Sequence, residues 1–175
     1  MTAATVSPSN IASLTDGPLY KAICTAVGNA LIMCECRARC VGVSTVPSSD
    51  PGRISGLIGV HGKVSGFVTV NMAERLAIRA VNGLLQDQQQ TLTAQVVDGV
   101  GEITNIIVGG IKSVLADTTW AFPHITVPSV IVGSGYRMAY AKGLEFLCVT
   151  FEHDDPDAVM LDDRLLQVSV SLLKL

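Results

Sequence analysis

The sequence has few charged residues, fewer aromatic ones and no cluster of positive charge. Charged residues make up 15% of its 175 positions and aromatic residues 5%, and the twelve Lys and Arg are spread along the chain. The formal net charge is −3 and the pI is near 5.5. Because nucleic-acid affinity rests on neutralising phosphates, we expect no nucleic-acid partner.

Hydrophobic stretches long enough to cross a bilayer are also missing. No apolar run approaches the roughly 20 residues that a membrane-spanning helix needs. The first positive side chain is Lys21, so the amino terminus lacks the basic segment that opens a signal peptide. These absences predict a cytoplasmic protein without membrane insertion.

The cysteines form neither a disulfide framework nor a zinc motif. There are five, an odd number, and four of them lie between Cys24 and Cys40. Cys34 and Cys36 are separated by one residue, no CxxC pair occurs and no histidine is near in sequence, so a thiolate metal site is the weaker alternative. We expect reduced thiols in the core and no metal ligands.

The composition predicts one domain with a mixed α+β fold. Hydrophobic residues make up 49% of the chain, which is enough for one well-filled core but not for two. Residues 1–14 show little periodicity and are predicted to be a loose arm before a single domain over 15–175. Hydrophobic periods and turn signals predict these elements in order: long helix 16–36, strands 40–46, 53–60 and 65–71, short helix 74–85, long helix 91–117, and strands 125–132, 137–141, 144–153 and 165–173.

The two halves of this pattern share one order, a long helix and then strands. The tetrapeptide TVPS at 45–48 recurs at 126–129, downstream of the second long helix, which favours an internal repeat. If the halves correspond, Asn29 aligns with Asn105, and Ala26 stands where the second helix has Glu102. Such a repeat would carry a polar site on one helix only.

The segment 91–117 has the strongest helical pattern in the chain. Thr91 and Thr93 are candidate N-caps, and no proline interrupts the run. Apolar residues recur at three- and four-residue steps along one face: Val97, Val100, Ile103, Ile107, Ile111 and Val114. The pattern predicts a long amphipathic helix with its other face exposed.

That other face carries an unusual set of residues. At about 100° per residue, five residues fall within roughly 40° of one line. They are Asp98, Glu102, Asn105, Gly109 and Lys112, here called the polar stripe, and Gly101 lies beside them. Each glycine inside a helix costs on the order of 1 kcal/mol relative to alanine, and this helix has four. Either another molecule approaches this surface closely, or the helix packs closely against another element.

The motif Asp98-x-x-x-Glu102-x-x-Asn105 on a long helix, followed by the segment TVPSVIVG at 126–133, resembles the CheC/CheX/FliY phosphatases of bacterial chemotaxis. The sequence is most similar to the CheX branch. The resemblance implies two long helices packed on an antiparallel-rich sheet, a homodimer and a single active site. The implied substrate is a phosphorylated CheY-like receiver protein, whose aspartyl phosphate is hydrolysed. No cofactor is expected on this chain, and Mg²⁺ would be supplied by the receiver.

The resemblance also implies roles for the residues of the stripe. Asn105 would orient the attacking water, and Glu102 would pair with the active-site lysine of the receiver. Asp98, Gly101 and Gly109 would support substrate binding. A Glu and an Asn three positions apart are common on exposed helix faces, so two alternatives remain: a non-catalytic module that docks a receiver or another partner, and a purely structural self-associating domain.

The carboxy-terminal segment 165–171 could present an edge for strand pairing between two copies of the chain. It reads LLQVSVS. The implied homodimer is therefore expected to form through this segment.

Overall fold

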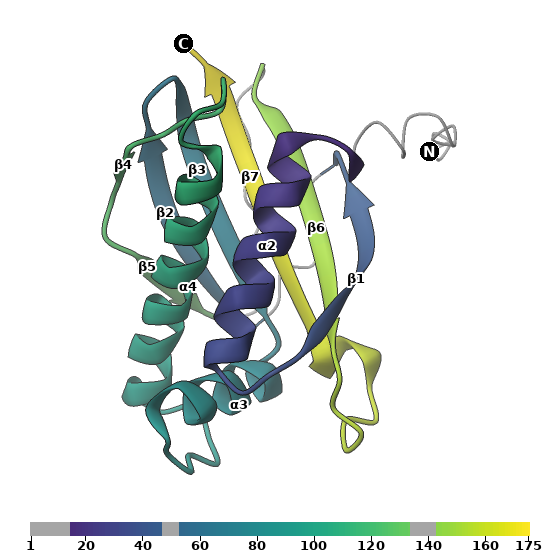
Figure 1. Ribbon diagram of the computed structural model, residues 1–175. Helices are drawn as coiled ribbons and strands as arrows, with labels where there is room; N and C mark the ends of the chain where they lie inside the picture. Colours follow the sequence, from purple (N-terminus) through teal and green to yellow (C-terminus); the bar gives the residue numbers. More distant parts are fainter. Residues whose placement is uncertain (1–14, 47–52, 134–142) are drawn as a thin grey trace.

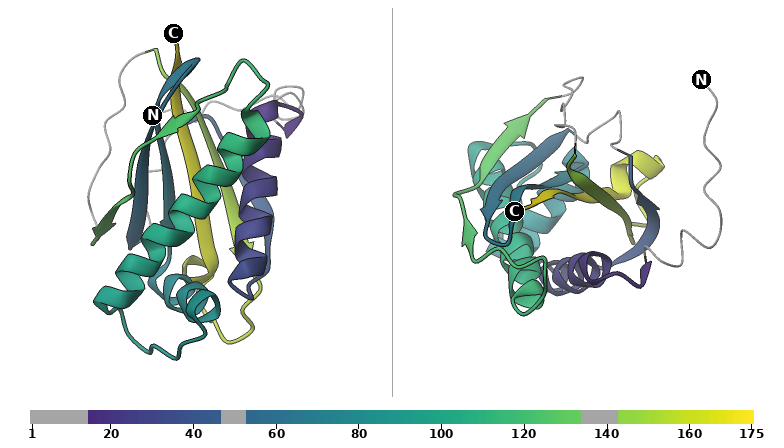
Figure 2. Two further views of the ribbon diagram at one scale, coloured as in Figure 1. Left: turned by 60° about the vertical axis from the view of Figure 1, so that its left-hand side comes forward. Right: turned by 90° about the horizontal axis from the view of Figure 1, so that it is seen from above.

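A seven-stranded antiparallel sheet carries two long helices side by side on one of its faces (Figures 1 and 2). The computed structural model describes residues 15–46, 53–133 and 143–175. The helices are α2 (Pro18–Met33), α3 (Glu74–Leu85), which closes one end of the molecule, and α4 (Ala94–Leu115). The strands are β1 (Ala38–Ser44), β2 (Ile54–His61), β3 (Val64–Met72), β4 (His124–Ile125), β5 (Ser129–Val132), β6 (Glu145–His153) and β7 (Leu165–Lys174), with a short 3-10 helix at Leu161–Arg164.

The predicted elements are confirmed with small shifts at their ends, and one strand is divided. The predicted strand 125–132 is β4 and β5, and both pair with β2. Pro128 lies in the interruption, where its missing N–H cannot join a ladder. The predicted strand 137–141 and the predicted arm 1–14 lie outside the described residues.

The strand order confirms an internal repeat. The neighbours in the sheet run β1-β6-β7-β3-β2-β4, and β5 also pairs with β2. Strands β7 and β3 lie at the centre of the sheet, and β6 and β2 flank them. Strand β1 of the first half lies outside β6 of the second half, and β4 and β5 of the second half lie outside β2 of the first half. Each half therefore contributes a long helix and three strand positions to one continuous sheet.

The repeat aligns the two long helices in a different register from the one predicted. Aligning Thr45 with Thr126 also superposes buried positions, which are Ala22, Ile23, Ala26, Val27 and Ala30 in α2 and Ile103, Thr104, Ile107, Val108 and Ile111 in α4. The predicted alignment of Asn29 with Asn105 is wrong, because it would set buried Ala26 against exposed Glu102. In the observed register Lys21 and Cys24 correspond to Glu102 and Asn105.

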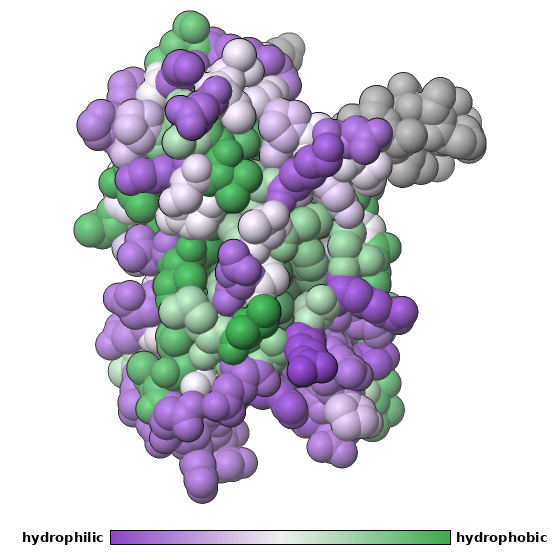
Figure 3. Space-filling model, in the orientation of Figure 1, coloured by the Kyte–Doolittle hydropathy of each residue, from purple (hydrophilic) through white to green (hydrophobic). Residues whose placement is uncertain are grey.

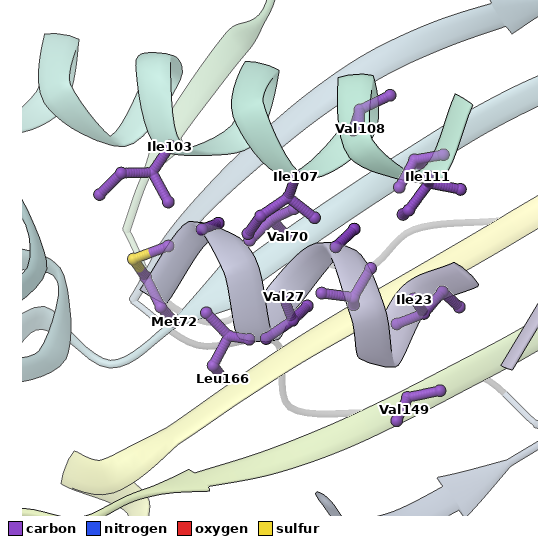
Figure 4. Close-up of a cluster of buried hydrophobic side chains, with 14 of the residues drawn as sticks. Ile23, Val27, Val70, Met72, Ile103, Ile107, Val108, Ile111, Val149 and Leu166 are labelled. Carbon is purple, nitrogen blue, oxygen red and sulfur yellow. The ribbon is translucent and has the colours of Figure 1, made fainter. Parts of the chain in front are cut away.

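The core lies between the sheet and the two long helices (Figure 4). Ile103, Ile107 and Ile111 of α4 are fully buried, and Figure 4 shows them directed toward α2 and toward β3 at Val70. Two residues of the predicted apolar face differ, since Val97 is only partly buried and Val114 is 44% exposed. Their places in the core are taken by Val96, Val108 and Leu115.

Two glycines of α4 allow close packing against other helices. A Cβ added at Gly99 would meet the side chain of Val81 on α3 at 2.6 Å. One added at Gly110 would meet the Cβ of Ala26 on α2 at 2.9 Å. Each of these two glycines costs free energy inside the helix, and the close packing of α3 and α2 against them offsets that cost.

The expected pairing edge at 165–171 is wrong. Strand β7 is hydrogen-bonded to β3 on one side and to β6 on the other along nearly its whole length. A strand paired on both sides has no open row of N–H and C=O groups to offer a second copy. Among the described strands, the ends of the sheet are β1 on one side and β4 and β5 on the other.

Candidate active site

Helix α4 begins at a capped end and presents one long face away from the sheet. The Thr93 side chain accepts a hydrogen bond from the Val96 N–H at 3.3 Å, which confirms one of the two predicted caps. The helix then runs for 22 residues without interruption. Beneath it, a Cβ at Gly56 of β2 would overlap the Thr104 side chain, so α4 lies close upon the sheet. The apolar side is thereby fixed and the opposite side is turned to the surface.

The polar stripe lies on this outer side, as predicted. Asp98, Glu102 and Asn105 are exposed, and Gly109 and Lys112 are partly exposed. Glu102 and Asn105 are three residues apart, which places them about 4.5 Å apart along the helix axis and within roughly 60° around it. Within the described ranges, neither side chain has a hydrogen-bond or ion-pair partner in this chain. Both are therefore available to a group that approaches from outside.

Gly109 leaves a gap within the stripe. A Cβ built there would have nothing within 4 Å, unlike those at Gly99 and Gly110. Internal packing therefore does not explain this glycine. No contact within the chain compensates for the free energy that a glycine costs inside a helix. The absence of a side chain next to Asn105 lets another molecule come closer to the helix backbone.

Gly101 has a different place from the one that its spacing suggested. It is buried, and a Cβ there would touch Val130 at 3.6 Å and Pro128 at 3.7 Å. The segment 126–130 thus runs along α4 on the side of Asn105. Thr126 fixes this segment to β2, because its hydroxyl accepts from the Gly59 N–H at 3.0 Å and its own N–H donates to the Gly59 carbonyl at 2.9 Å. Gly101 is therefore covered by this segment and is not exposed on the stripe.

Exposed apolar residues lie on the two elements that pack against α4, and sequence reasoning missed them. Val127 in the segment just described is 83% exposed. On α2, which packs against the other side of α4, Ile32 is 70% and Met33 55% exposed. Figure 3 shows the face that carries the two helices, with apolar and polar side chains intermixed on it. Exposed apolar residues beside a polar centre are typical of protein interfaces. Helical spacing predicted the buried side of α2 but gave no sign of these exposures.

The stripe combines acids with a neutral amide and contains no Ser, Thr, Cys or His. A carboxamide both donates and accepts hydrogen bonds without a change of charge, so Asn105 can hold a water in one orientation. The carboxylates of Asp98 and Glu102 can accept from a cationic donor. Among the described residues, no group of three or more His, Cys, Asp or Glu side chains is arranged to hold a metal ion. None of the described helices has the length and apolar character of a membrane span.

A protein-family model described as "Chemotaxis phosphatase CheX" matches residues 54–152, which is more than half of the chain and includes the whole stripe. No curated protein sequence matches. Among solved structures, a chemotaxis protein CheX from Desulfovibrio desulfuricans is 23% identical with a TM-score of 0.73, over 87% of this chain and 98% of that one. A putative chemotaxis protein from Desulfovibrio vulgaris Hildenborough is 24% identical with a TM-score of 0.76, over 91% and 99%.

A third similar structure was solved together with a partner. It is the CheX-CheY-BeF₃-Mg²⁺ complex from Borrelia burgdorferi, and the similarity to this chain is 22% identity with a TM-score of 0.69, over 89% of this chain and 96% of that one. These likenesses confirm the fold expected from the sequence.

Proposed function

This chain belongs to the CheX family of chemotaxis phosphatases, and we propose that it hydrolyses the aspartyl phosphate of a CheY-like response regulator at the polar stripe of α4. The observation that carries the assignment to this surface is the position of Glu102 and Asn105. They share one exposed helix face and have no partner within the described chain. The complex of the Borrelia relative with CheY supports a receiver as the partner.

The chemistry requires little from this chain because an aspartyl phosphate is already reactive. Hydrolysis needs a water held in line with the bond between phosphorus and the leaving carboxylate oxygen. The Asn105 carboxamide accepts one hydrogen bond from this water and donates another to the phosphoryl oxygen. The water then attacks phosphorus, the P–O bond to the aspartate breaks, and inorganic phosphate leaves. No covalent intermediate on this chain is involved.

Glu102 serves to position the two proteins. It lies about one turn before Asn105, so it reaches the rim of the receiver site when Asn105 enters it. Its carboxylate pairs with the active-site lysine of the receiver, and such charge-assisted pairs fix register as well as adding affinity. Asp98 continues the same line toward the amino end of α4 and contacts the receiver outside the reacting centre. Gly109 allows the receiver backbone to approach next to Asn105.

The metal requirement is assigned to the receiver. The Borrelia complex contains Mg²⁺ and BeF₃, in which BeF₃ stands in for the phosphoryl group. When bound to the receiver, Mg²⁺ would neutralise charge on the phosphoryl oxygens. The acids on the stripe, Asp98 and Glu102, are exposed on successive turns and supply too few ligands for an octahedral ion by themselves.

We further propose that residues 15–175 form a single domain that self-associates in the cytoplasm. In the described parts of this range, a single sheet and a single contiguous core support this division. The edge at β5 is a better candidate than segment 165–171 for pairing between two copies of the chain, since Ile131 is 38% and Val132 51% exposed there. Light scattering at micromolar protein should give the mass of a dimer, and Val132→Lys should shift it toward the monomer. A monomeric wild-type chain would refute this part of the proposal.

The phosphatase assignment is tested by the lifetime of the phosphate on the receiver. Receivers from the source organism are phosphorylated with a small-molecule phosphodonor, and the loss of aspartyl phosphate is followed with and without this chain. The proposal predicts a lifetime that shortens in proportion to the concentration of the chain. Binding of a BeF₃-loaded receiver is measured in parallel. Binding without a shorter lifetime would favour the docking module instead.

A further inference from the structure

Two of the five cysteines are not in the core, contrary to the expectation from the sequence. Cys34, Cys36 and Cys148 are buried, whereas Cys24 is partly buried and Cys40 is exposed. Cys24 lies on α2 and Cys40 on β1. The phosphatase mechanism uses neither residue.

The register of β1 directs Cys40 toward the helices. Ala38 and Val43 of this strand pack against the core beneath the helices. Arg39, between Ala38 and Cys40, is 79% exposed and forms an ion pair of 2.9 Å with Glu152 of β6. Because side chains alternate along a strand, Cys40 lies on the same face as Ala38. The bulge between Cys40 and Gly42 then restores the inward direction for Val43.

The side of α2 that faces away from α4 completes the cluster. Tyr20 and Cys24 are one turn apart on this side, and both are partly buried against the core. Tyr20 interacts with the Cys40 and Cys24 side chains, and these interactions raise the pKa of its phenol. Cys40 also acts on Cys24, whose thiol pKa is raised first by burial and further by this neighbour. A helix thiol and a strand thiol, distant in sequence, thus meet at the surface under one phenol.

We propose that Cys24 and Cys40 form a dithiol site that low-molecular-weight disulfides oxidise to an intramolecular disulfide between α2 and β1. The Cys40 thiolate attacks one sulfur of the small disulfide, whose S–S bond breaks and releases one small thiol. The Cys24 thiolate then attacks the Cys40 sulfur and displaces the second small thiol. The protein loses two electrons and two protons, and the small disulfide gains them as two thiols.

Accessibility sets the order of these steps. Cys40 is exposed, so it meets the small disulfide first. Burial raises the pKa of the Cys24 thiol, although its hydrogen bond with Tyr20 opposes this effect. A buried thiol is a poor first nucleophile but a good second one, since the mixed disulfide forms directly beside it.

The remaining cysteines provide the contrast. Burial raises the pKa of the Cys34 thiol to about 12 and also raises that of Cys36. Cys148 is buried in β6, and burial raises its thiol pKa as well. These three thiols are therefore expected to stay reduced in the folded protein.

The test uses the full chain, with oxidised glutathione as the probe. After treatment, free thiols are alkylated and the protein is digested with trypsin. Cleavage after Lys21, Arg37, Arg39 and Arg53 leaves Cys40 alone in peptide 40–53, while peptide 22–37 holds Cys24, Cys34 and Cys36. The wild type should yield these two peptides joined by one disulfide. The midpoint of thermal unfolding should rise on oxidation by on the order of 5 °C, because the link constrains the unfolded chain.

Three variants assign the bond. Cys24→Ser should lose the joined peptides and keep glutathione on Cys40, and Cys40→Ser should show neither product. Cys34→Ser is the matched control, since it removes a thiol from the same peptide and should keep the joined pair. Three results would overturn the proposal: folded wild type that only accumulates glutathione on Cys40, folded wild type that does not react, or a joined pair that survives in Cys24→Ser.

Discussion

Helices α2 and α4 occupy equivalent places in the two halves of the fold, yet their outer faces differ. Both bury the same pattern of positions against the sheet. The outer face of α4 carries Asp98, Glu102 and Asn105, whereas α2 has no Asp or Glu in its 16 residues. Lys21 and Cys24 stand on α2 where α4 has the Glu/Asn pair.

The difference separates the demands of folding from those of function. A core position must be apolar and of the right size, so the inner faces of both helices follow one pattern. An outer position has no such requirement, and its residues are set by what they contact. The function of this fold must therefore be inferred from the outer face of each helix and not from the repeat that both share.

A large effect that distinguishes the two helices is expected at Glu102. Glu102→Ala should lower kcat/KM for receiver dephosphorylation by about 10- to 100-fold, since losing a charge-assisted pair costs about 1–3 kcal/mol. Lys21→Ala, at the equivalent place on α2, should leave kcat/KM within about 2-fold of wild type. The kcat/KM of each variant is obtained from phosphate lifetimes at several receiver concentrations. Equal losses in the two variants would mean that both helices take part in docking.

Loss of an ion pair at α3 should lower the stability of the whole fold without altering the outer face of α2 or of α4. Asp155, 2% exposed, accepts a hydrogen bond from Arg75 on α3 at 2.8 Å and lies 3.8 Å from Arg79. Asp155→Asn should lower the free energy of unfolding by on the order of 2 kcal/mol at pH 7, as loss of a charged hydrogen bond does. The dephosphorylation rate of the folded protein should not change. Urea denaturation and the lifetime assay measure the two effects separately.

The same ion pair predicts how stability depends on pH. The hydrogen bond from Arg75 holds the pKa of the Asp155 carboxyl below its usual range. A depressed pKa in the folded state adds stability above the unfolded-state pKa of about 3.9, and this stability is lost as the pH falls through the folded-state value. The gap in stability between wild type and Asp155→Asn should therefore close as the pH is lowered from 5 toward about 2. A gap that stays constant over that range would contradict this role for Asp155.

Adjacent glycines on α4 distinguish the contact with α2 from the outer surface. Gly110→Ala would bring a Cβ to 2.9 Å from Ala26, and the strain should outweigh the gain in helix propensity and destabilise the protein by about 1 kcal/mol. Gly109→Ala meets nothing within 4 Å and should stabilise the protein by up to about 1 kcal/mol. The second variant should nevertheless bind the receiver less tightly. A stabilised Gly109→Ala protein with unchanged affinity would show that the receiver does not approach this position.

The smallest effect is expected on the outer face of α2. Asn29→Ala removes an exposed amide from α2, on which Asn29 has no neighbouring acid. Its kcat/KM should equal that of wild type within the error of the assay, because Asn29 can contribute only at the rim of the interface. A loss as large as that of Glu102→Ala would assign chemistry to α2 and remove the asymmetry.

The sequence predicted the helices, most strands and the position of the stripe, because each depends on local periodicity. Val100, Ile103, Ile107 and Ile111 are spaced for one helix face, and they are buried as that spacing requires. The register of the repeat was predicted wrongly, since Asn29 and Ala26 were aligned by residue type without knowledge of burial. The pairing of β7 on both sides could not be predicted, because strand order depends on contacts between distant segments.

The same limit applies around the candidate site. Glycine spacing indicated close approach but could not tell which glycine meets which element, and of the four glycines of α4 only Gly109 proves open on the outer face. The exposure of Met33 and Val127 depends on where α2 and the segment 126–130 lie relative to α4. The meeting of Cys24 with Cys40 depends on the register of an edge strand. None of these features has a signal in local sequence.

The central claim is that Asn105 positions water and contributes little to binding, and one paired measurement tests it most directly. The rate of receiver dephosphorylation and the affinity for the BeF₃-loaded receiver are determined for wild type and Asn105→Ala, with folding verified by circular dichroism. A neutral amide that acts mainly in the transition state predicts that the rate falls nearly to that of the receiver alone. The affinity should stay within about 3-fold of wild type. An Asn105→Ala protein that dephosphorylates at the wild-type rate, or one whose rate falls only as far as its affinity, would contradict the account.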